Sequence, residues 1–294
     1  MALPDEVRIA CAQLARDARS VRIDLDAIET VEPGPAPALD PERHYLEGSE
    51  ADVATYLLTL DTVNFGSGWW PTLRKREVAG RAVSGYFTVA WALTDRFRAH
   101  GPWSNAELRA LRADEMAAVL GQPRDHELMA LFAQALRQLG AFLGERSALD
   151  LVREARGSAV RLAEMLAGGM AMYADRGFYK RAQIVPSDLA LAGVGQFGDL
   201  DRLTIFADNL VPHVLRVDGV LRYDPHLAER IDAGRLLAPG REEREIRACA
   251  VHASTLLAQR LGVDEQTLDH WLWNRGQQPR YKAIPRHRCR TVFY

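Results

Sequence analysis

One acidic residue interrupts the apolar stretch Leu203-Thr204-Ile205-Phe206-Ala207-Asp208-Asn209-Leu210-Val211-Pro212. Because proline has no backbone N–H, the carbonyl of Asp208, four residues before Pro212, cannot be hydrogen-bonded within a continuous helix. A helix must therefore bend, end or begin again at Asp208, whose carboxylate either caps the helix or is a reactive group. The apolar residues around it recur at the spacing of a buried helix face: Leu203, Phe206, Leu210 and Val214.

The composition is that of an ordinary globular protein. The chain has 294 residues, of which 48% are hydrophobic and 26% charged, and a net charge of −2. This length can bury a large core, and the charge excludes a broad cationic surface for nucleic acid. Asp5 and Glu6 lie where a signal peptide would be apolar, and no run of residues is long and apolar enough to span a bilayer. We therefore expect a cytoplasmic protein that binds neither nucleic acid nor membrane.

No metal site is expected from the sequence. The three cysteines, Cys11, Cys249 and Cys289, are far apart and form no Cys-x-x-Cys pair. The eight histidines are scattered and form no His-Glu-x-x-His motif. Ligands for a zinc site are thus not grouped along the chain.

Helical patterns cover most of the chain and predict an all-α fold of about a dozen helices, one large domain over residues 1–294. Serines at 104, 147 and 158 are predicted helix caps, and residues 217–223 form either a short strand or a turn. A proline-rich connector occupies residues 32–37, and an aromatic loop rich in glycine occupies residues 64–71. Helices are predicted over residues 7–19, 51–63, 78–98, 125–142, 178–192, 241–261 and 264–275.

The segment Leu191-Ala192-Gly193-Val194-Gly195 follows one of these helices and leads toward Asp208. It resembles the hairpin of the helix-hairpin-helix DNA glycosylases, in which an aspartate on the following helix assists cleavage of an N-glycosidic bond. Two features depart from that pattern, because Asp208 follows the hairpin closely and the hairpin contains no lysine. A Gly-x-Gly between helices is also commonly only a helix end and turn.

Further segments, in order along the chain, make a closer match. The chain resembles the queuosine salvage protein family, whose members are queuosine 5′-phosphate N-glycosylases with a fold related to that of DNA glycosylases. The resemblance is strong over residues 177–294 and looser upstream, where His44 and the loop of residues 64–70 are recognisable. The segments that carry it are Phe178–Ile184, Thr204–Asp208, Arg244–Cys249, Leu268–Trp273 and Ala283–Tyr294.

The resemblance implies hydrolysis of queuosine 5′-monophosphate to queuine and ribose 5-phosphate without a cofactor. Asp208 would stabilise the positive charge that develops on the ribose and orient the attacking water. The leaving base is a 7-deazaguanine, which lacks the N7 that purine glycosidases protonate, so a closely fitting base pocket matters more than one general acid.

The same resemblance assigns the base pocket. Phe206 would stack on the planar base, although the apolar pattern alone makes it a core residue. Asp269 and Trp273 lie one helical turn apart and share a helix face. Asp269 would accept hydrogen bonds from the guanine-like edge of the base, with Trp273 beside it. Taken alone, Asp269 is more simply an acid near a helix N-terminus.

Three more residues complete the expected substrate site. The assignment of His44 rests on the resemblance, because a lone histidine is usually structural. Lys180 and Arg181 point about 100° apart on a helix, so at most one faces the pocket, and we expect Lys180 to contact the 5′-phosphate. Tyr294 is placed near the ligand, whereas Trp69 and Trp70 either line the pocket or fill the core.

Two other functions fit parts of the sequence. A DNA base-excision glycosylase would need a cationic groove, which the net charge of −2 disfavours. A non-catalytic queuine-binding protein would bury the base without turnover.

Overall fold

The computed structural model describes residues 1–294 and confirms the predicted all-α class. The strands are β1 (Val21–Ile23), β2 (Glu77–Val78), β3 (Arg81–Ala82) and β4 (Leu221–Tyr223), and the 3-10 turns are η1 (Ser67–Trp69), η2 (Ala171–Tyr173) and η3 (Leu200–Arg202). The helices are α1 (Leu3–Arg16), α2 (Leu25–Ile28), α3 (Glu50–Thr62), α4 (Gly85–His100), α5 (Asn105–Ala110), α6 (Ala113–Leu120), α7 (Glu127–Leu143), α8 (Ala148–Glu154), α9 (Ala159–Gly169), α10 (Lys180–Leu191), α11 (Val211–Val217), α12 (Pro225–Asp232), α13 (Arg241–Leu261), α14 (Glu265–Arg275) and α15 (Pro279–Lys282).

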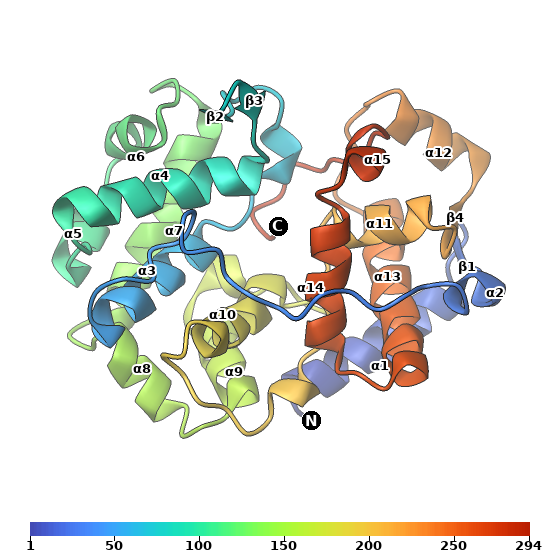
Figure 1. Cartoon of the computed structure of the whole chain (residues 1–294), viewed down its shortest axis with the longest axis horizontal. Coiled ribbons are helices and arrows are strands. Elements are labelled where there is room, and N and C mark those ends of the chain that lie inside the picture. The colour runs from blue at the N-terminus through green and yellow to red at the C-terminus, as the bar shows by residue number, and fades with distance from the viewer.

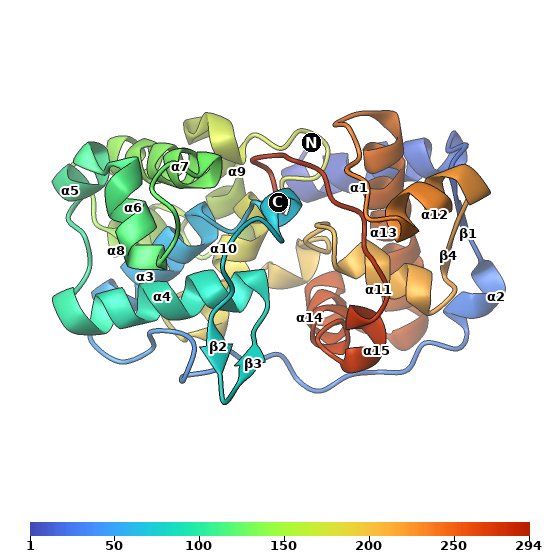
Figure 2. The ribbon, with the colours of Figure 1, turned by 90° about the horizontal axis from the view of Figure 1, so that it is seen from above.

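The helices gather on two sides of α10. Helices α3 to α9 lie on the left of Figure 1, and α1 with α11 to α15 lies on the right. The connector between α2 and α3 crosses in front from one side to the other (Figure 1). Seen from above, the C-terminal segment also runs from α15 back toward α10 and η1 (Figure 2). These crossings bring residues that are distant in sequence to the centre of the molecule.

A hydrophobic core of 70 buried residues extends from Leu3 to Tyr281. Helix α1 packs against α13, and Val7 and Cys11 on its inner face are fully buried. The missed strand β1 pairs antiparallel with β4, with Arg22 opposite Arg222. Only three residues of β1 take part, which is too few to produce a clear alternation in the sequence.

Serine caps begin several helices as predicted. The hydroxyls of Ser104 and Ser147 each accept a hydrogen bond from the backbone N–H three residues later, in capping boxes completed by Glu107 and Asp150. Ser158 caps α9 in the same way, accepting from the N–H of Arg161. Local hydrogen bonding therefore sets the boundaries of these helices.

The helix expected from residue 78 begins instead at Gly85, and this prediction was wrong by about two turns. Residues 77–82 form the β2–β3 hairpin, whose turn has Ala79 and Gly80 at positive φ. The true start is capped by Ser84, which accepts a hydrogen bond from the N–H of Phe87. The apolar pattern continues across the hairpin, so periodicity alone could not locate this boundary.

The expected helical run around Asp208 is also corrected. Residues 203–210 are extended or bent, and α11 begins only at Val211. The predicted break at Asp208 is confirmed, and so is the burial of Leu203, Phe206, Leu210 and Val214. An extended segment can bury all of these residues because neighbouring helices surround it on several sides.

The glycine hairpin after α10 is a helix end. Gly193 has φ +74°, and the N–H groups of Val194 and Gly195 both point to the carbonyl of Leu189. The next elements are η3 and the extended segment, so the expected helix does not follow directly. No helix of the chain has the length and apolarity required to cross a membrane.

Candidate active site

A cavity of about 290 Å³ lies where the connector, α4, α10, α14 and the extended segment meet. This volume is close to the lower end of the usual range for small-molecule pockets. The structure places all seven sequence-predicted site residues on its wall: His44, Lys180, Phe206, Asp208, Asp269, Trp273 and Tyr294.

The carboxylate of Asp208 is held by the start of α11. Its Oδ1 accepts hydrogen bonds from the N–H of Leu210 at 2.6 Å and of Val211 at 3.0 Å. Asp208 therefore caps the helix and also faces the cavity. The capping interpretation is thus confirmed, and the position of the side chain on the cavity wall is compatible with the alternative, a reactive group.

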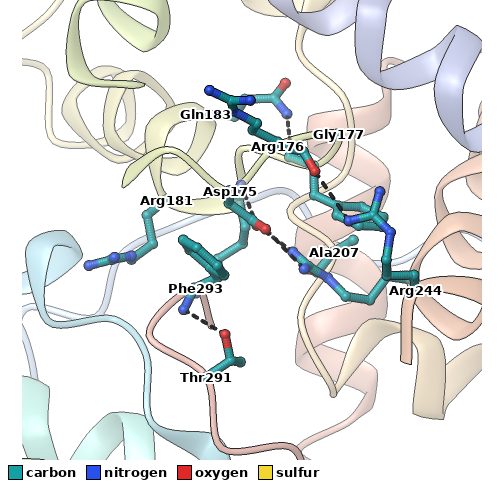
Figure 3. A network of polar contacts seen from close by, with 12 residues as sticks. Asp175, Arg176, Gly177, Arg181, Gln183, Ala207, Arg244, Thr291 and Phe293 are labelled. Carbon is teal, nitrogen blue, oxygen red and sulfur yellow. Dashed lines mark hydrogen bonds and ion pairs between the residues drawn. The ribbon is translucent and has the colours of Figure 1, made fainter. Parts of the chain in front are cut away.

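A buried ion pair supports the backbone just before Asp208. Arg247 donates to the carbonyl of Ala207 at 2.9 Å and forms two hydrogen bonds with Asp175, at 3.1 and 2.5 Å. Figure 3 shows Asp175 and Ala207 within this network of polar contacts. The guanidinium also lies 3.9 Å from the ring centroid of Phe178. Because both charged groups are buried and fully paired, they fix the position of the Ala207–Asp208 backbone.

Asp269 connects α14 to the same segment. Its Oδ1 accepts a hydrogen bond from the backbone N–H of Phe206 at 2.8 Å. Burial raises the pKa of Asp269 to about 8, and the negative charge of Asp208 adds to this effect. Without a ligand, the carboxyl is therefore largely protonated at neutral pH. A ligand that offers two N–H donors would favour its ionised form.

Aromatic rings form the walls beside these acids. Phe206 packs edge-on against the His270 ring, with centroids 6.2 Å apart. Trp273 makes edge-on contacts with Tyr86 and Phe87, each with centroids 5.4 Å apart. These rings surround a narrow apolar space that suits a planar heterocycle.

His44 is fixed from both sides of its ring. Nδ1 lies 3.0 Å from the carbonyl oxygen of Asp40, and Nε2 lies 3.0 Å from the hydroxyl of Tyr86. Burial lowers the pKa of His44, which favours the neutral ring. A neutral histidine in this position orients Tyr86 and contributes no charge to the cavity.

Lys180 is the central cation of the site. Its Nζ donates to the carbonyl and side-chain oxygens of Asn64, at 3.0 and 2.8 Å. Burial lowers its pKa, while the nearby carboxylates of Asp208 and Asp61 oppose that shift. Arg181 points away from this group and donates to the carbonyls of Thr62 and Val292. The expectation that only one of these two neighbouring cations faces the pocket is confirmed.

The C-terminal residue reaches the cavity through a close contact with the glycine loop. The N–H of Gly66 donates to the carbonyl oxygen of Tyr294 at 2.9 Å. A Cβ on Gly68 would lie 2.2 Å from the carbonyl oxygen of Cys289, so only glycine allows this approach. Of the neighbouring tryptophans, Trp70 lines the cavity, whereas Trp69 is buried and donates to Glu127.

Four charged residues on the wall were missed from the sequence, and two of them, Asp40 and Arg43, pair with each other. On α10, Lys180, Ile184 and Asp188 follow one another at intervals of four residues and line the cavity from one helix face. This spacing was a signal in the sequence from which Asp188 could have been identified. Arg286 lies in the C-terminal segment, with no hydrogen bond or ion pair to the protein. Its sequence neighbourhood, rich in arginine, gave no indication of which cation would face inward.

The site carries charges of both signs. Asp188, Asp208 and Asp269 line the interior, where Lys180 is the central cation. Burial lowers the pKa of Arg286, and the nearby carboxylate of Asp208 opposes that shift. Burial also lowers the pKa of Lys282, and Arg286 is one of the cations that add to this effect. The cations around Arg286 and Lys282 can therefore bind an anionic part of a ligand.

Comparison with known proteins gives one consistent result. A sequence model described as queuosine salvage protein matches residues 43–294. A Sphaerobacter thermophilus protein named queuosine 5′-phosphate N-glycosylase/hydrolase is 35% identical, over 96% of this chain and 95% of the relative. Proteins of the same name from Bos taurus and Mus musculus are 28% and 26% identical, over 84% and 100% of this chain.

Proposed function

The chain belongs to the queuosine salvage protein family, and on this basis we propose that it hydrolyses queuosine 5′-phosphate to queuine and ribose 5-phosphate. The reaction breaks the N-glycosidic bond between C1′ of the ribose and N9 of the deazapurine, and water supplies the new hydroxyl. The observation that carries the assignment of the site is the presence of Asp208, Phe206 and Asp269 on the wall of one cavity.

Asp208 acts at the ribose. As the C1′–N9 bond lengthens, positive charge develops on C1′ and the ring oxygen. A carboxylate nearby stabilises that charge, and its free oxygen can accept a proton from the attacking water. Oδ1 is engaged by two backbone N–H groups, which leaves Oδ2 for this role.

The base lies between the aromatic walls. Phe206 offers a ring face, and Trp273 closes the pocket from α14. Asp269 accepts from the N1–H and the exocyclic amine of the base, in its ionised form. His44 positions Tyr86 beside the base, and Tyr294 closes the cavity from the C-terminal side.

The phosphate has two candidate partners. Lys180 was expected from the sequence to bind it, but its ammonium already donates twice to Asn64 and lies among carboxylates. Arg286 forms no hydrogen bond or ion pair with the protein, and its charge acts on Lys282 as well as interacting with Asp208. We favour Arg286, because a free guanidinium can form two hydrogen bonds with a phosphate dianion. In that arrangement Lys180 balances the charge of Asp208.

The direct test is to incubate the purified protein with an excess of queuosine 5′-phosphate and to follow free queuine by chromatography. Many moles of queuine per mole of protein are expected. Release of no more than one equivalent would identify a queuine-binding protein without turnover and would overturn the proposal.

A further inference from the structure

Asp188 is buried, with an exposed fraction of only 3%, and its carboxylate has no hydrogen-bond partner within the protein. Its side chain lines the cavity, and the groups that affect its carboxyl are the charges of Asp61 and Lys180, with no hydrogen-bond donor among them. The two acids of the proposed catalytic and base-binding site differ in this respect. Asp208 accepts from two N–H groups and Asp269 from one. A buried carboxylate with no donor is costly unless a ligand or a proton satisfies it.

A second unpartnered acid stands behind it. Asp61, on α3, is fully buried, and neither of its carboxylate oxygens has a hydrogen-bond partner. Burial raises the pKa of both acids, to about 7 for Asp61, and the charge of Asp61 raises the pKa of Asp188 further. Lys180 opposes both shifts, but it also lies near Asp208 and Asp269. This end of the cavity therefore has an excess of acids over cations.

The queuine base carries one group that matches this excess. Its C7 substituent is an aminomethyl arm with a secondary amine, which is protonated near neutral pH and offers two N–H donors. The guanine-like edge lies at another position of the ring system and has Asp269 as its partner in the proposed function, whereas Asp208 acts at the ribose. Asp188 is therefore available for the third part of the substrate, the cationic arm.

We propose that Asp188 binds the secondary ammonium of the C7 side chain, with Asp61 behind it increasing the negative potential. This inference rests on the proposed function for the identity of the ligand. Tyr86, oriented by His44, lies on the same side of the cavity, and Asp188 is the charge that most affects its hydroxyl after burial. Asp188 is therefore a specificity residue: it favours a deazaguanine with a cationic arm over one without.

The test compares ligands that differ only in the arm. Calorimetric titration with queuine and with 7-deazaguanine, which lacks the arm, is carried out on the wild type and on Asp188→Asn. A charge-assisted hydrogen bond contributes about 10- to 100-fold in affinity. Asp188→Asn is expected to weaken queuine binding by that factor and to leave 7-deazaguanine binding unchanged. Asp61→Asn is expected to show a smaller loss for queuine alone, because Asp61 acts through the potential only.

Asp218→Asn is the matched control. Asp218 is a largely buried acid outside the cavity that pairs with Arg275 and Tyr281. Its replacement should change neither titration. Thermal melting shows whether each variant folds. If Asp188→Asn does not fold, Asp61→Asn is used in its place for the comparison of queuine with 7-deazaguanine.

Two results would overturn the subsite. Equal losses for both ligands would place Asp188 at the base itself, and unchanged queuine binding would show that the carboxyl is merely protonated and inert. Failure of the proposed function is separate, because it would appear as wild-type protein that releases no queuine from the nucleotide.

Discussion

Oδ1 of Asp269 accepts a hydrogen bond from the backbone N–H of Phe206 at 2.8 Å. This contact joins α14 to the extended segment two residues before Asp208. It holds Asp269, Phe206 and Asp208 in one rigid arrangement, and these are the residues proposed to bind the base edge, stack on the base and act at the ribose. Preorganisation of this kind keeps the reacting groups in position without reorganisation during the reaction.

Asp208→Asn is predicted to abolish most turnover and to keep the fold. The amide oxygen of Asn can still accept from Leu210 and Val211, so the cap on α11 is retained. The negative charge opposite the ribose is lost, and kcat is expected to fall by roughly 10²–10⁴-fold. Single-turnover assays with queuosine 5′-phosphate, together with titration of free queuine, separate chemistry from binding.

Asp224→Asn provides the control for this change. Asp224 caps α12 through the same pattern, accepting from the N–H of His226 and Leu227, and lies outside the cavity. The two variants should have similar melting temperatures and very different turnover. Near-normal turnover by Asp208→Asn would remove the residue from the mechanism and leave it only as a cap.

Asp269 predicts a pH dependence of base binding. The protein without ligand holds this carboxyl protonated below a pKa of about 8, whereas the two N–H donors of the base bind its ionised form. Affinity for 7-deazaguanine, which lacks the ionisable amine of the C7 arm, should rise as the pH increases from 6 to 8 and then level off. In Asp269→Asn the affinity should be weaker and flat over this range. A flat wild-type profile would contradict the assignment.

The raised pKa of Asp269 also predicts that the stability of the protein without ligand falls as the pH rises, whereas its affinity for the base increases. The unfolded chain ionises Asp269 near its ordinary pKa of 3.8, and the folded protein near 8. Between these values the folded state holds more protons, so this group makes the protein less stable as the pH rises. Asp269→Asn should remove that loss, and its melting temperature should exceed that of the wild type most clearly at pH 8.

Much of the helix content was predictable because local signals set it. Ser104, Ser147 and Ser158 cap helices by bonds that span three residues, and such bonds are visible in the sequence. The seven predicted residues of the cavity wall were identified from the resemblance to a protein family. That resemblance assigned Asp208 and Asp269 to one site without any knowledge of the distance between them.

The errors arose where tertiary packing determined the outcome. Residues 203–210 are apolar with helical spacing, yet they are extended because Asp269 and Arg247 bind their backbone groups. Nothing local encodes these two contacts, which cross 40 or more residues of the chain. Arg286 and Asp188 were missed for the same reason, since whether a charged side chain faces a cavity depends on segments brought together by the fold.

Asp175→Asn is predicted to destabilise the protein strongly. The change leaves Arg247 buried with one acid removed, which typically costs roughly 3–5 kcal/mol. Arg153→Gln removes an exposed pair with Asp150 and should cost less than about 1 kcal/mol. Urea unfolding of both variants provides the comparison. Equal, small effects would show that the buried pair does not fix the backbone at Ala207.

The 5′-phosphate distinguishes Arg286 from Lys180. Arg286→Gln removes a guanidinium without protein partners, so it should lower kcat/KM for queuosine 5′-phosphate by about 10- to 100-fold and affect the free nucleoside little. Lys180→Ala removes a buried cation near Asp208, Asp61 and Asp269 and should impair both substrates alike, because its charge balances these interior carboxylates. Arg280→Gln, an exposed change outside the cavity, is the control and should affect neither substrate. If Lys180→Ala selectively impairs the nucleotide while Arg286→Gln does not, the phosphate lies at Lys180, as the sequence first indicated. The ribose phosphate would then lie beside Lys180, among the aspartates, rather than beside Arg286.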